Sequence, residues 1–253
     1  MRETMGRGGE GKGGELPGHC AAESRACGGH SSDLSRWLAW VLRHGATKEG
    51  LAMDSAGWVA VAGIVAARQT SLDEVRSVVE RCPKQRFQMH EDSTGAWIRA
   101  TQGHSLKMVS DESIHRPLTS AADIGQEQVV HGTYLRHWLK IRLEGLRKMS
   151  RNHIHLCLGL PGSGVVSGMR HSCEVAIHIN LQAAIDGGVK LMQSSNGVIL
   201  TPGEGEGVLA PRYFTSAVWL GPNQRVKIYD CQKGDLLTEM RRKHPELQAA
   251  VEQ

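Results

Sequence analysis

The stretch "RFQMHEDSTGAWIRA", residues 86–100, has two short runs of strand-forming residues on either side of a run of turn-forming residues. RFQMH and AWIRA are expected to be strands, and EDSTG is expected to be the turn that joins them. The stretch therefore predicts a β-hairpin that ends near Ala100.

The elements before this hairpin predict a winged-helix domain. Ser32 and Asp33 are suitable helix N-caps, and apolar residues then recur at helical spacing as far as Gly45, a natural helix end. A short strand at 57–61, a short helix at 62–68 and a helix capped by Ser71 follow. Helix, strand, helix, helix and hairpin is the order of a winged helix, which commonly binds nucleic acids but can also serve packing or protein contacts alone.

The second half of the chain predicts a further lobe, so the expected fold class is α+β. The polar stretch 106–126 lacks periodicity and is expected to be a linker. A helix is expected at 134–145 and a short one after Pro211. The expected strands are 128–132, 153–158, 173–179, 189–193, 196–200 and 216–220. Because short strands outnumber helices, we expect a compact mixed sheet rather than a doubly wound parallel one.

The two ends of the chain are expected to lie outside both lobes. Residues 1–30 are rich in Gly and small polar residues, which is typical of a disordered tail. The charged end contains one expected helix, at 235–243. The predicted organisation is a Gly-rich tail at 1–30, a winged-helix lobe at 31–105, a linker at 106–126, a second lobe at 127–220 and a charged, solvated tail at 221–253.

Composition limits the class of protein. The 253 residues can form one large domain or two small ones, and the net charge of +4 is compatible with a nucleic-acid partner without demonstrating one. The six cysteines occur singly, and no apolar run approaches the roughly 20 residues of a membrane span. We therefore expect a monomer of the cytoplasm, the nucleus or both, with no membrane partner.

Two glycine-containing motifs invite functional interpretations. "RHG", residues 43–45, resembles the phosphate-handling tripeptide of histidine phosphatases, but there it follows a strand and here it ends a helix. The loop "GLPGSGVVSG", residues 159–168, lacks the G-K-[ST] of a phosphate-binding loop and misses the spacing of a dinucleotide fingerprint. This loop is expected to be a connection, and "RHG" is left as a helix end or a different kind of phosphate clamp.

Histidines and arginines are the remaining candidates for binding a metal or a phosphate. "HGT", residues 131–133, follows a strand, and "HIHL" places His153 and His155 on the same face of another. No further zinc ligands accompany that pair, and nothing suggests a fold around His19, Cys20, Cys27 and His30, so no metal is expected. Guanidinium groups bind phosphate oxygens in pairs, so Arg43, Arg86 and Arg151 would form a phosphate site if the lobes brought them together.

Several blocks between Leu34 and Phe214 occur in a recognisable order. They are "LSRWLAWVLRHGA", "GWV", "KQRF", "IRATQGHS", "VHGT" with a later "W" and "GL", "SRNHIHL" and "SSNGVILT". Together they resemble the RNA 2′-phosphotransferase family, also called tRNA 2′-phosphotransferases. Thr101 departs slightly from the expected pattern, and the two ends of the chain lie outside it.

The resemblance implies an RNA-binding winged-helix lobe and an ADP-ribosyltransferase-like lobe that binds NAD⁺ as a consumed co-substrate. The implied substrate is the internal 2′-phosphate at the splice junction of ligated tRNA. This phosphate first attacks the ribose C1″ of NAD⁺ and expels nicotinamide. The 2″-hydroxyl then attacks phosphorus, which releases 2′-hydroxyl RNA and ADP-ribose 1″,2″-cyclic phosphate.

The resemblance places the catalytic set on Arg43, His44, Arg86 and Arg151. A phosphomonoester has its second pKa at about 6, so the first step needs positioning rather than a base. The second step develops charge around phosphorus, where fixed arginines stabilise it. His44 either hydrogen-bonds the phosphate or protonates the departing 2′-oxygen.

The resemblance also implies which residues bind NAD⁺, and two alternative functions stay open. The residues implied to bind NAD⁺ are His131, Gly132, Thr133, His155, Ser195 and Asn196. One alternative is an enzyme of this fold that ADP-ribosylates terminal phosphates of RNA or DNA and stops after the first step. The other is an RNA-binding module without activity. The complete arginine set favours the two-step reaction.

Overall fold

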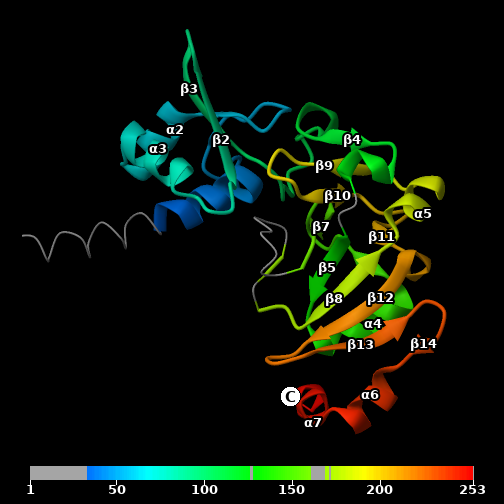
Figure 1. Cartoon of the computed structure of the whole chain (residues 1–253). Coiled ribbons are helices and arrows are strands. Elements are labelled where there is room, and N and C mark those ends of the chain that lie inside the picture. Colours follow the sequence, from blue (N-terminus) through cyan, green and yellow to red (C-terminus); the bar gives the residue numbers. More distant parts are fainter. Residues whose placement is uncertain (1–32, 126–127, 161–168, 171, 253) are drawn as a thin grey trace, which may run out of the picture.

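The computed structural model describes residues 33–125, 128–160, 169–170 and 172–252 (Figure 1). The predicted tail at 1–30 and most of the Gly-rich connection at 159–168 lie outside the described residues. The described chain forms an α+β protein whose small three-stranded sheet and large nine-stranded sheet each have their own apolar core.

The small sheet and its helices follow the predicted order of elements. A helix at 33–40 continues directly into a π-helical turn, η1 (Val41–Gly45). The other elements are β1 (Val59–Ala60), α2 (Val61–Arg68), α3 (Leu72–Glu80), β2 (Phe87–Asp92) and β3 (Gly95–Ala100). The expected N-cap Ser71 is confirmed at α3, and the structure adds a capping box in which Ser71 and Glu74 each accept a hydrogen bond from the other's backbone.

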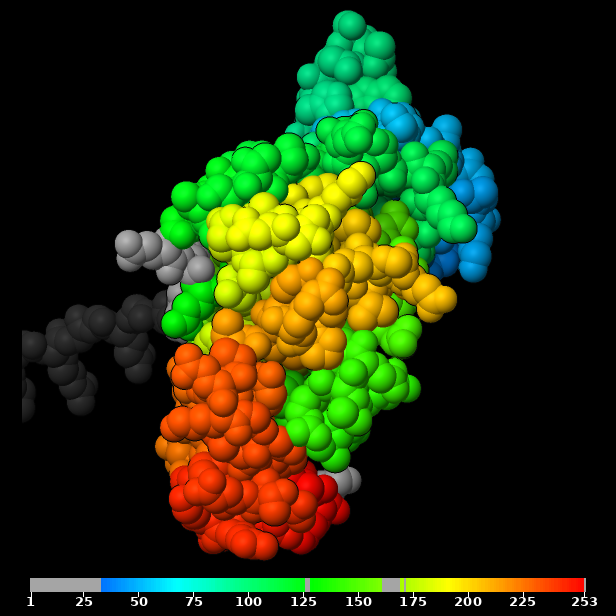
Figure 2. Space-filling view, turned by 90° about the vertical axis from the view of Figure 1, so that its right-hand side faces the viewer, coloured from blue at the N-terminus to red at the C-terminus, as the bar shows by residue number. Residues whose placement is uncertain are grey.

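The hairpin is longer and its turn tighter than predicted. β2 and β3 pair from Phe87 opposite Ala100 to Asp92 opposite Gly95, so the turn consists of Ser93 and Thr94 rather than of EDSTG. The Asp92 carboxylate accepts a hydrogen bond from the Thr94 amide at 2.7 Å, which stabilises the tight turn. Figure 2 shows the hairpin projecting from one end of the molecule, with the C-terminal helices at the other.

The large sheet has the order β14-β13-β12-β8-β5-β7-β10-β9-β4. Its strands are β4 (Arg116–Leu118), β5 (Val129–Thr133), β7 (Ile154–Leu158), β8 (Val175–Ile179), β9 (Leu191–Gln193), β10 (Ile199–Thr201), β12 (Phe214–Leu220), β13 (Arg225–Asp230) and β14 (Gly234–Asp235). Among the described residues every pairing in this sheet is antiparallel, so the prediction of a mixed sheet was wrong. Short strands joined by loops and short helices can alternate in direction without long crossovers.

Helices and a two-stranded ribbon surround this sheet. The ribbon pairs β6 (Leu146–Arg147) with β11 (Val208–Leu209). The helices are η2 (Asp111–Ser113), η3 (Ala121–Ile124), α4 (Leu135–Glu144), α5 (Leu181–Asp186), η4 (Pro211–Tyr213), α6 (Leu237–Lys243) and α7 (Pro245–Val251). Trp138 of α4 is fully buried and meets Tyr229 of β13 edge to face at 5.7 Å. In the described part of the chain, no helix combines the length and apolarity that crossing a membrane requires.

Two segments expected outside the lobes are instead part of the large sheet. The expected linker 106–126 contains β4, the edge strand beside β9, and an edge is where a sheet accepts a proline such as Pro117. The expected solvated tail 221–253 contains β13, whose Val226 and Ile228 are buried while Arg225 and Lys227 are exposed. This alternation buries one face of the strand, and the charged residues on its other face gave the segment the composition of a tail.

Candidate active site

A cavity of about 520 Å³ lies where the small lobe meets the large sheet. Its cationic lining residues are Arg43, Lys84, Arg86, Arg147, Lys148, Arg151 and Arg170. No aspartate or glutamate occurs among the described residues that line it. A concave surface with charges of one sign concentrates the field, so the cavity is suited to a polyanion.

The π-helical turn places Arg43 in this cavity. The turn spans "VLRHG" and inserts one extra residue per turn, a distortion that is frequent at functional sites. Gly45 has no positive φ, in contrast to the usual glycine helix end. A Cβ atom on Gly45 would lie only 2.6 Å from the Trp40 ring, so close packing against this ring requires the glycine. Arg43 and His44 therefore lie in the last turn of a helix, as predicted.

Arg43 is held among like charges. Burial, followed by the nearby Arg151 and Arg86, lowers the pKa of Arg43 to about 10. Its guanidinium is still charged at neutral pH, and its buried Nε finds no hydrogen-bond partner among the described residues. Cations placed together with an unsatisfied donor are stabilised when an anion enters between them. The structure thus brings three of the predicted catalytic residues around one cavity.

Arg86 and Arg151 come from opposite sides of the cavity. Arg86 directly precedes β2 and follows Gln85, which has a positive φ of 45°. Arg151 is the more exposed and ends a turn in which its amide donates to the carbonyl of Lys148 at 3.2 Å. Partial desolvation, and then Arg170, lower the pKa of Arg151. The two arginines are therefore carried by independent loops that precede strands.

His44 lies behind Arg43 and is not among the residues that line the cavity. Its Nδ1 is 2.8 Å from Oγ of Ser105, and the Ser105 amide donates to the carbonyl of Arg43. Burial, followed by Arg43 and Arg151, lowers the pKa of His44 below its ordinary value of 6.5. The imidazole is thus mostly neutral at neutral pH, and Ser105 fixes its orientation.

His131 and His155 line the other side of the cavity. Nδ1–H of His131 donates to the carbonyl of His155 at 2.9 Å, which leaves Nε2 of neutral His131 as an acceptor. Burial lowers the pKa of His131, and burial followed by Arg151 lowers the pKa of His155 to about 3. Both rings are neutral, so they bind by hydrogen bonding rather than by charge.

Two glycines contact this part of the cavity closely. Gly103 has a φ of +91°, and a Cβ atom there would lie 3.4 Å from Nε of Arg43 and 3.6 Å from Nε2 of His155. Gly132 of β5 is one of the residues implied to bind NAD⁺, and it lines the cavity. Its free side is covered by Met169, since a Cβ atom there would lie 2.3 Å from the Met169 side chain. Thr133, next to Gly132, also lines the cavity.

Ser195 and Asn196 lie away from the cavity lining. Ser195 is exposed in the turn between β9 and β10. Asn196 is buried, and its Nδ2 donates to the carbonyls of Lys84 and Gln85 at 3.1 and 3.2 Å. In this structure Asn196 therefore holds the loop that carries Arg86, and its contact with NAD⁺ stays a prediction.

Other lining residues were not singled out from the sequence. They are Lys84, Gln102, Tyr134, His137, Arg147, Lys148, Met149, Ser150, Ile154 and Met169. Lys84 and Gln102 belong to the blocks "KQRF" and "IRATQGHS" quoted for the family resemblance, and these blocks could have indicated that both residues lie near the site. Arg99 is not among the lining residues: its Nε donates to Oε1 of Gln88 at 2.8 Å and its guanidinium is stacked on the Trp58 ring.

The fold and the cavity define an α+β protein with a cationic site suited to phosphorylated ligands. Residues 29–203 match the model of the RNA 2′-phosphotransferase, Tpt1 / KptA family. The chain belongs to this family of transferases. The match includes both lobes and the three arginines around the cavity, and β12, β13 and the C-terminal helices lie beyond it.

Curated relatives agree with this assignment. The chain is 44% identical over 226 residues to the tRNA 2′-phosphotransferase 1 of Danio rerio. The aligned region covers 87% of this chain and 95% of that relative. It is 43% identical over 198 residues to the tRNA 2′-phosphotransferase 1 of Homo sapiens, with 76% and 77% covered. It is 39% identical over 181 residues to the tRNA 2′-phosphotransferase of Saccharomyces cerevisiae, with 66% and 77% covered.

Proposed function

We propose that this protein is an NAD⁺-dependent tRNA 2′-phosphotransferase. It would remove the internal 2′-phosphate at the splice junction of ligated tRNA and release 2′-hydroxyl RNA, nicotinamide and ADP-ribose 1″,2″-cyclic phosphate. The observation that carries the proposal is the convergence of Arg43, Arg86 and Arg151 on one cavity whose described lining residues include no aspartate or glutamate. The names of the relatives agree with this substrate class.

The arginines would bind the RNA 2′-phosphate as a dianion. Arg43 is less exposed than Arg151, and its pKa is lowered first by burial and then by repulsion from Arg151 and Arg86, which a bound dianion would relieve. In the first step the bound phosphate oxygen would attack C1″ of the NAD⁺ ribose while the C1″–nicotinamide bond breaks. The arginines hold the nucleophile in place and leave it ionised, so no catalytic base is required.

The second step would place the greater demand on Arg151. When the ribose 2″-hydroxyl attacks phosphorus, negative charge grows on the equatorial oxygens and on the departing RNA 2′-oxygen. Arg151 is the most open of the three arginines and can follow the transferring group. The proton lost by the 2″-hydroxyl and the proton gained by the RNA 2′-oxygen balance, so the step needs no redox partner.

NAD⁺ would occupy the side of the cavity formed by β5 and the start of β7. Arg147, Lys148 and Arg170 supply positive charge there for a pyrophosphate. His131 offers a neutral acceptor, and movement of Met169 from Gly132 would open the backbone to a ring of the dinucleotide. We further propose that the small lobe is a winged helix that binds RNA and that the large lobe has the ADP-ribosyltransferase fold.

His44 would orient the phosphate rather than act as a charged acid in the unliganded protein, since its pKa is lowered. If the Ser105 hydroxyl donates to Nδ1, the proton of the neutral ring is on Nε2 and can be donated to a phosphate oxygen. A bound dianion raises the pKa of a nearby imidazole, so the same residue can then deliver a proton to the departing 2′-oxygen.

The test combines purified protein, NAD⁺ and an oligonucleotide with one internal 2′-phosphate, in the presence of a chelator. We expect 2′-hydroxyl RNA, one nicotinamide and one ADP-ribose cyclic phosphate for each phosphate removed. Arg86→Ala should abolish all three products. Arg76→Ala is the matched control, because Arg76 pairs at the surface with Asp73 and Glu91 and does not line the cavity.

Two results would replace the proposal by its alternatives. Stable ADP-ribosylation of a terminally phosphorylated oligonucleotide, with the internal 2′-phosphate untouched, would identify an enzyme that stops after the first step. RNA binding without nicotinamide release would identify a binding module.

A further inference from the structure

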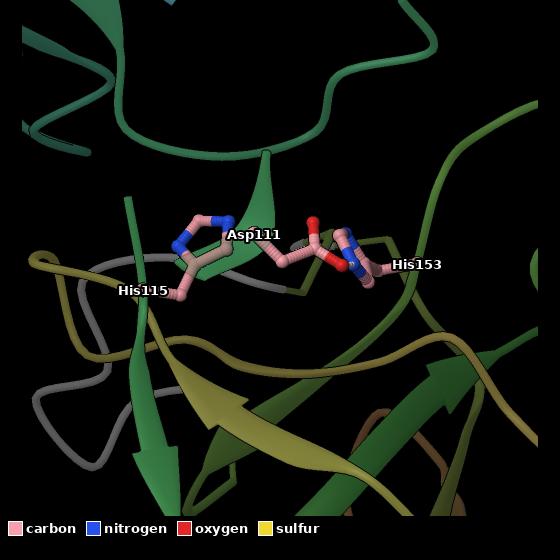
Figure 3. A group of neighbouring side chains, drawn as sticks. All are labelled: Asp111, His115 and His153. Carbon is pink, nitrogen blue, oxygen red and sulfur yellow. Dashed lines mark ion pairs between the residues drawn. The ribbon is translucent and has the colours of Figure 1, made fainter. Parts of the chain in front are cut away.

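A second cluster of polar side chains adjoins the cavity and consists of Asp111, His115 and His153, of which His153 also lines the cavity (Figure 3). One ligand atom from each residue lies within 4.8 Å of the others, and Nε2 of His153 is 2.9 Å from Oδ2 of Asp111. Among the described residues this is the one group of three histidine, cysteine or acidic side chains with such spacing. Figure 3 shows the Asp111 carboxylate directed toward His153, with the His115 ring on the other side.

The backbone holds this cluster together from two distant segments. Asp111 and His115 are four residues apart across the η2 turn, where the His115 amide donates to the Asp111 carbonyl at 2.9 Å. His153 directly precedes β7. Its neighbour Asn152 donates from its amide to His104 and from its side chain to the carbonyl of Leu106. The segment 106–126 is thereby fixed against the turn that carries Arg151.

The cluster has the chemistry of a transition-metal site rather than of a packed polar core. His115 and His153 are buried at 6% and 4% exposure, while Asp111 remains partly open to solvent. Nδ1 of His115 is buried without a hydrogen-bond partner among the described residues, and such a nitrogen costs free energy unless something binds it. Two imidazoles and one carboxylate are common Zn²⁺ ligands, and water can complete the tetrahedron on the open side.

The distances are compatible with this ion. Zn²⁺ bonds of about 2.0–2.1 Å place tetrahedral ligand atoms about 3.3 Å apart. The 2.9 Å pair is already at this scale, and the widest separation must close by no more than about 1.5 Å. The partly exposed Asp111 side chain has room to rotate. An ion at this position would also neutralise the carboxylate and take the place of the proton shared by Asp111 and His153.

We propose that Asp111, His115 and His153 form a Zn²⁺ site that fastens segment 106–126 to the start of β7. The ion stands outside the proposed phosphoryl transfer. Its role is to hold the turn of Arg151 and the adjoining edge strand β4 in place, because its ligands come from both segments. Both Asp111 and His115 lie outside the sequence blocks quoted for the family resemblance.

The test is metal binding to the full chain after chelator treatment, followed by removal of the chelator. Calorimetric titration with ZnSO₄ should show one tight site, and saturating Zn²⁺ should raise the melting temperature by about 5 °C or more. Asp111→Asn and His115→Gln should each weaken this site more than about tenfold and remove the thermal shift. Neither variant changes a residue that lines the active-site cavity.

His90→Gln is the matched control. His90 also faces an aspartate, with Nε2 3.5 Å from Asp92, but this pair is exposed and has no third ligand. The His90→Gln variant should have the same Zn²⁺ affinity and the same Zn²⁺-dependent rise in melting temperature as the parent chain. Co²⁺ titration gives a direct readout, since the visible absorption of a histidine-bound ion should appear in the parent and in His90→Gln and be absent from His115→Gln.

The proposal would be overturned by the absence of a one-to-one site in the parent chain. It would equally be overturned if Asp111→Asn and His115→Gln bound Zn²⁺ as the parent does, because the ion would then sit on other histidines or cysteines. A melting temperature that saturating Zn²⁺ leaves unchanged would also contradict the proposal.

Discussion

The side-chain amide of Asn196 donates a hydrogen bond to the carbonyl oxygen of Gln85 at 3.2 Å, although 111 residues separate the two in sequence. The same carbonyl accepts from Oγ1 of Thr101 at 3.1 Å. Gln85 has a positive φ, which is uncommon for a residue other than glycine and persists only where the surroundings hold it. Asn196 and Thr101 therefore stabilise the conformation that directs the next residue, Arg86, to the cavity.

Asn196→Ala should lower turnover by about 10- to 100-fold, because a small displacement of Arg86 is enough to misplace the phosphate. The KM for NAD⁺ should change little, and the free energy of unfolding should fall by about 1 kcal/mol, since the carbonyls of Lys84 and Gln85 each lose a donor. Steady-state kinetics and urea unfolding measure both effects. Asn180→Ala, which removes the cap of α5, should lose similar stability at unchanged turnover. An increased KM for NAD⁺ at constant kcat would instead identify Asn196 as a direct contact of the dinucleotide.

Arg151→Ala should slow the second chemical step more than the first. Removing one fixed donor from a developing phosphorane-like charge costs about 10²–10³ in rate, whereas the first step retains Arg43 and Arg86 around the nucleophile. In single-turnover reactions, ADP-ribosylated RNA should accumulate before 2′-hydroxyl RNA appears. Arg76→Ala should follow the parent time course. Equal slowing of both steps would contradict this division of roles.

Local sequence patterns located most helices and strands, but the pairing of strands depends on distant residues. Ser71 was correctly predicted as the N-cap of α3, because a cap depends on residues that follow it directly in sequence. β13 alternates charged and apolar residues, but this pattern forms a strand of the sheet only because β13 pairs with β12 and packs against Trp138 of α4. The antiparallel order of the large sheet likewise arises from contacts that no short window contains.

The candidate site was likewise predicted only in part from the sequence. Arg43, Arg86, Arg151, His131 and His155 were implied by the family resemblance, and the structure places all five in the cavity lining. The structural task of Asn196 could not be predicted, because it depends on the strained backbone of a loop in the other lobe. The cluster of Asp111, His115 and His153 was missed because it joins an expected linker to a strand.

Gly103→Ala should impair activity beyond its effect on stability. A side chain at a φ of +91° costs about 1–2 kcal/mol, and its Cβ would come into van der Waals contact with Arg43 at 3.4 Å and His155 at 3.6 Å. We expect kcat/KM to fall by at least about tenfold, with a melting temperature lowered by a few degrees. Gly188→Ala is the matched control, since Gly188 has a φ of +83° but open space around it. If both variants lose stability and activity to the same extent, the contact with Arg43 has no special role.

Mild acid should destabilise the protein through its buried neutral histidines. Burial first, and then neighbouring cations, lower the pKa of His104 and of His155 from 6.5 to about 3. Above pH 6.5 both rings are neutral in the folded and the unfolded chain, so the full stability is present there. As the pH falls below 6.5 only the unfolded chain binds protons at these two positions, and the two groups together should remove about 3 kcal/mol per pH unit until the pH approaches 3.

Urea unfolding between pH 7.5 and 5, with a chelator present, measures this slope. His104→Gln should reduce the slope by the share of one group, about 1.4 kcal/mol per pH unit, because glutamine does not titrate. His90→Gln, at an exposed position, should leave the slope as it is. A stability independent of pH over this range would show that both rings become protonated in the folded protein.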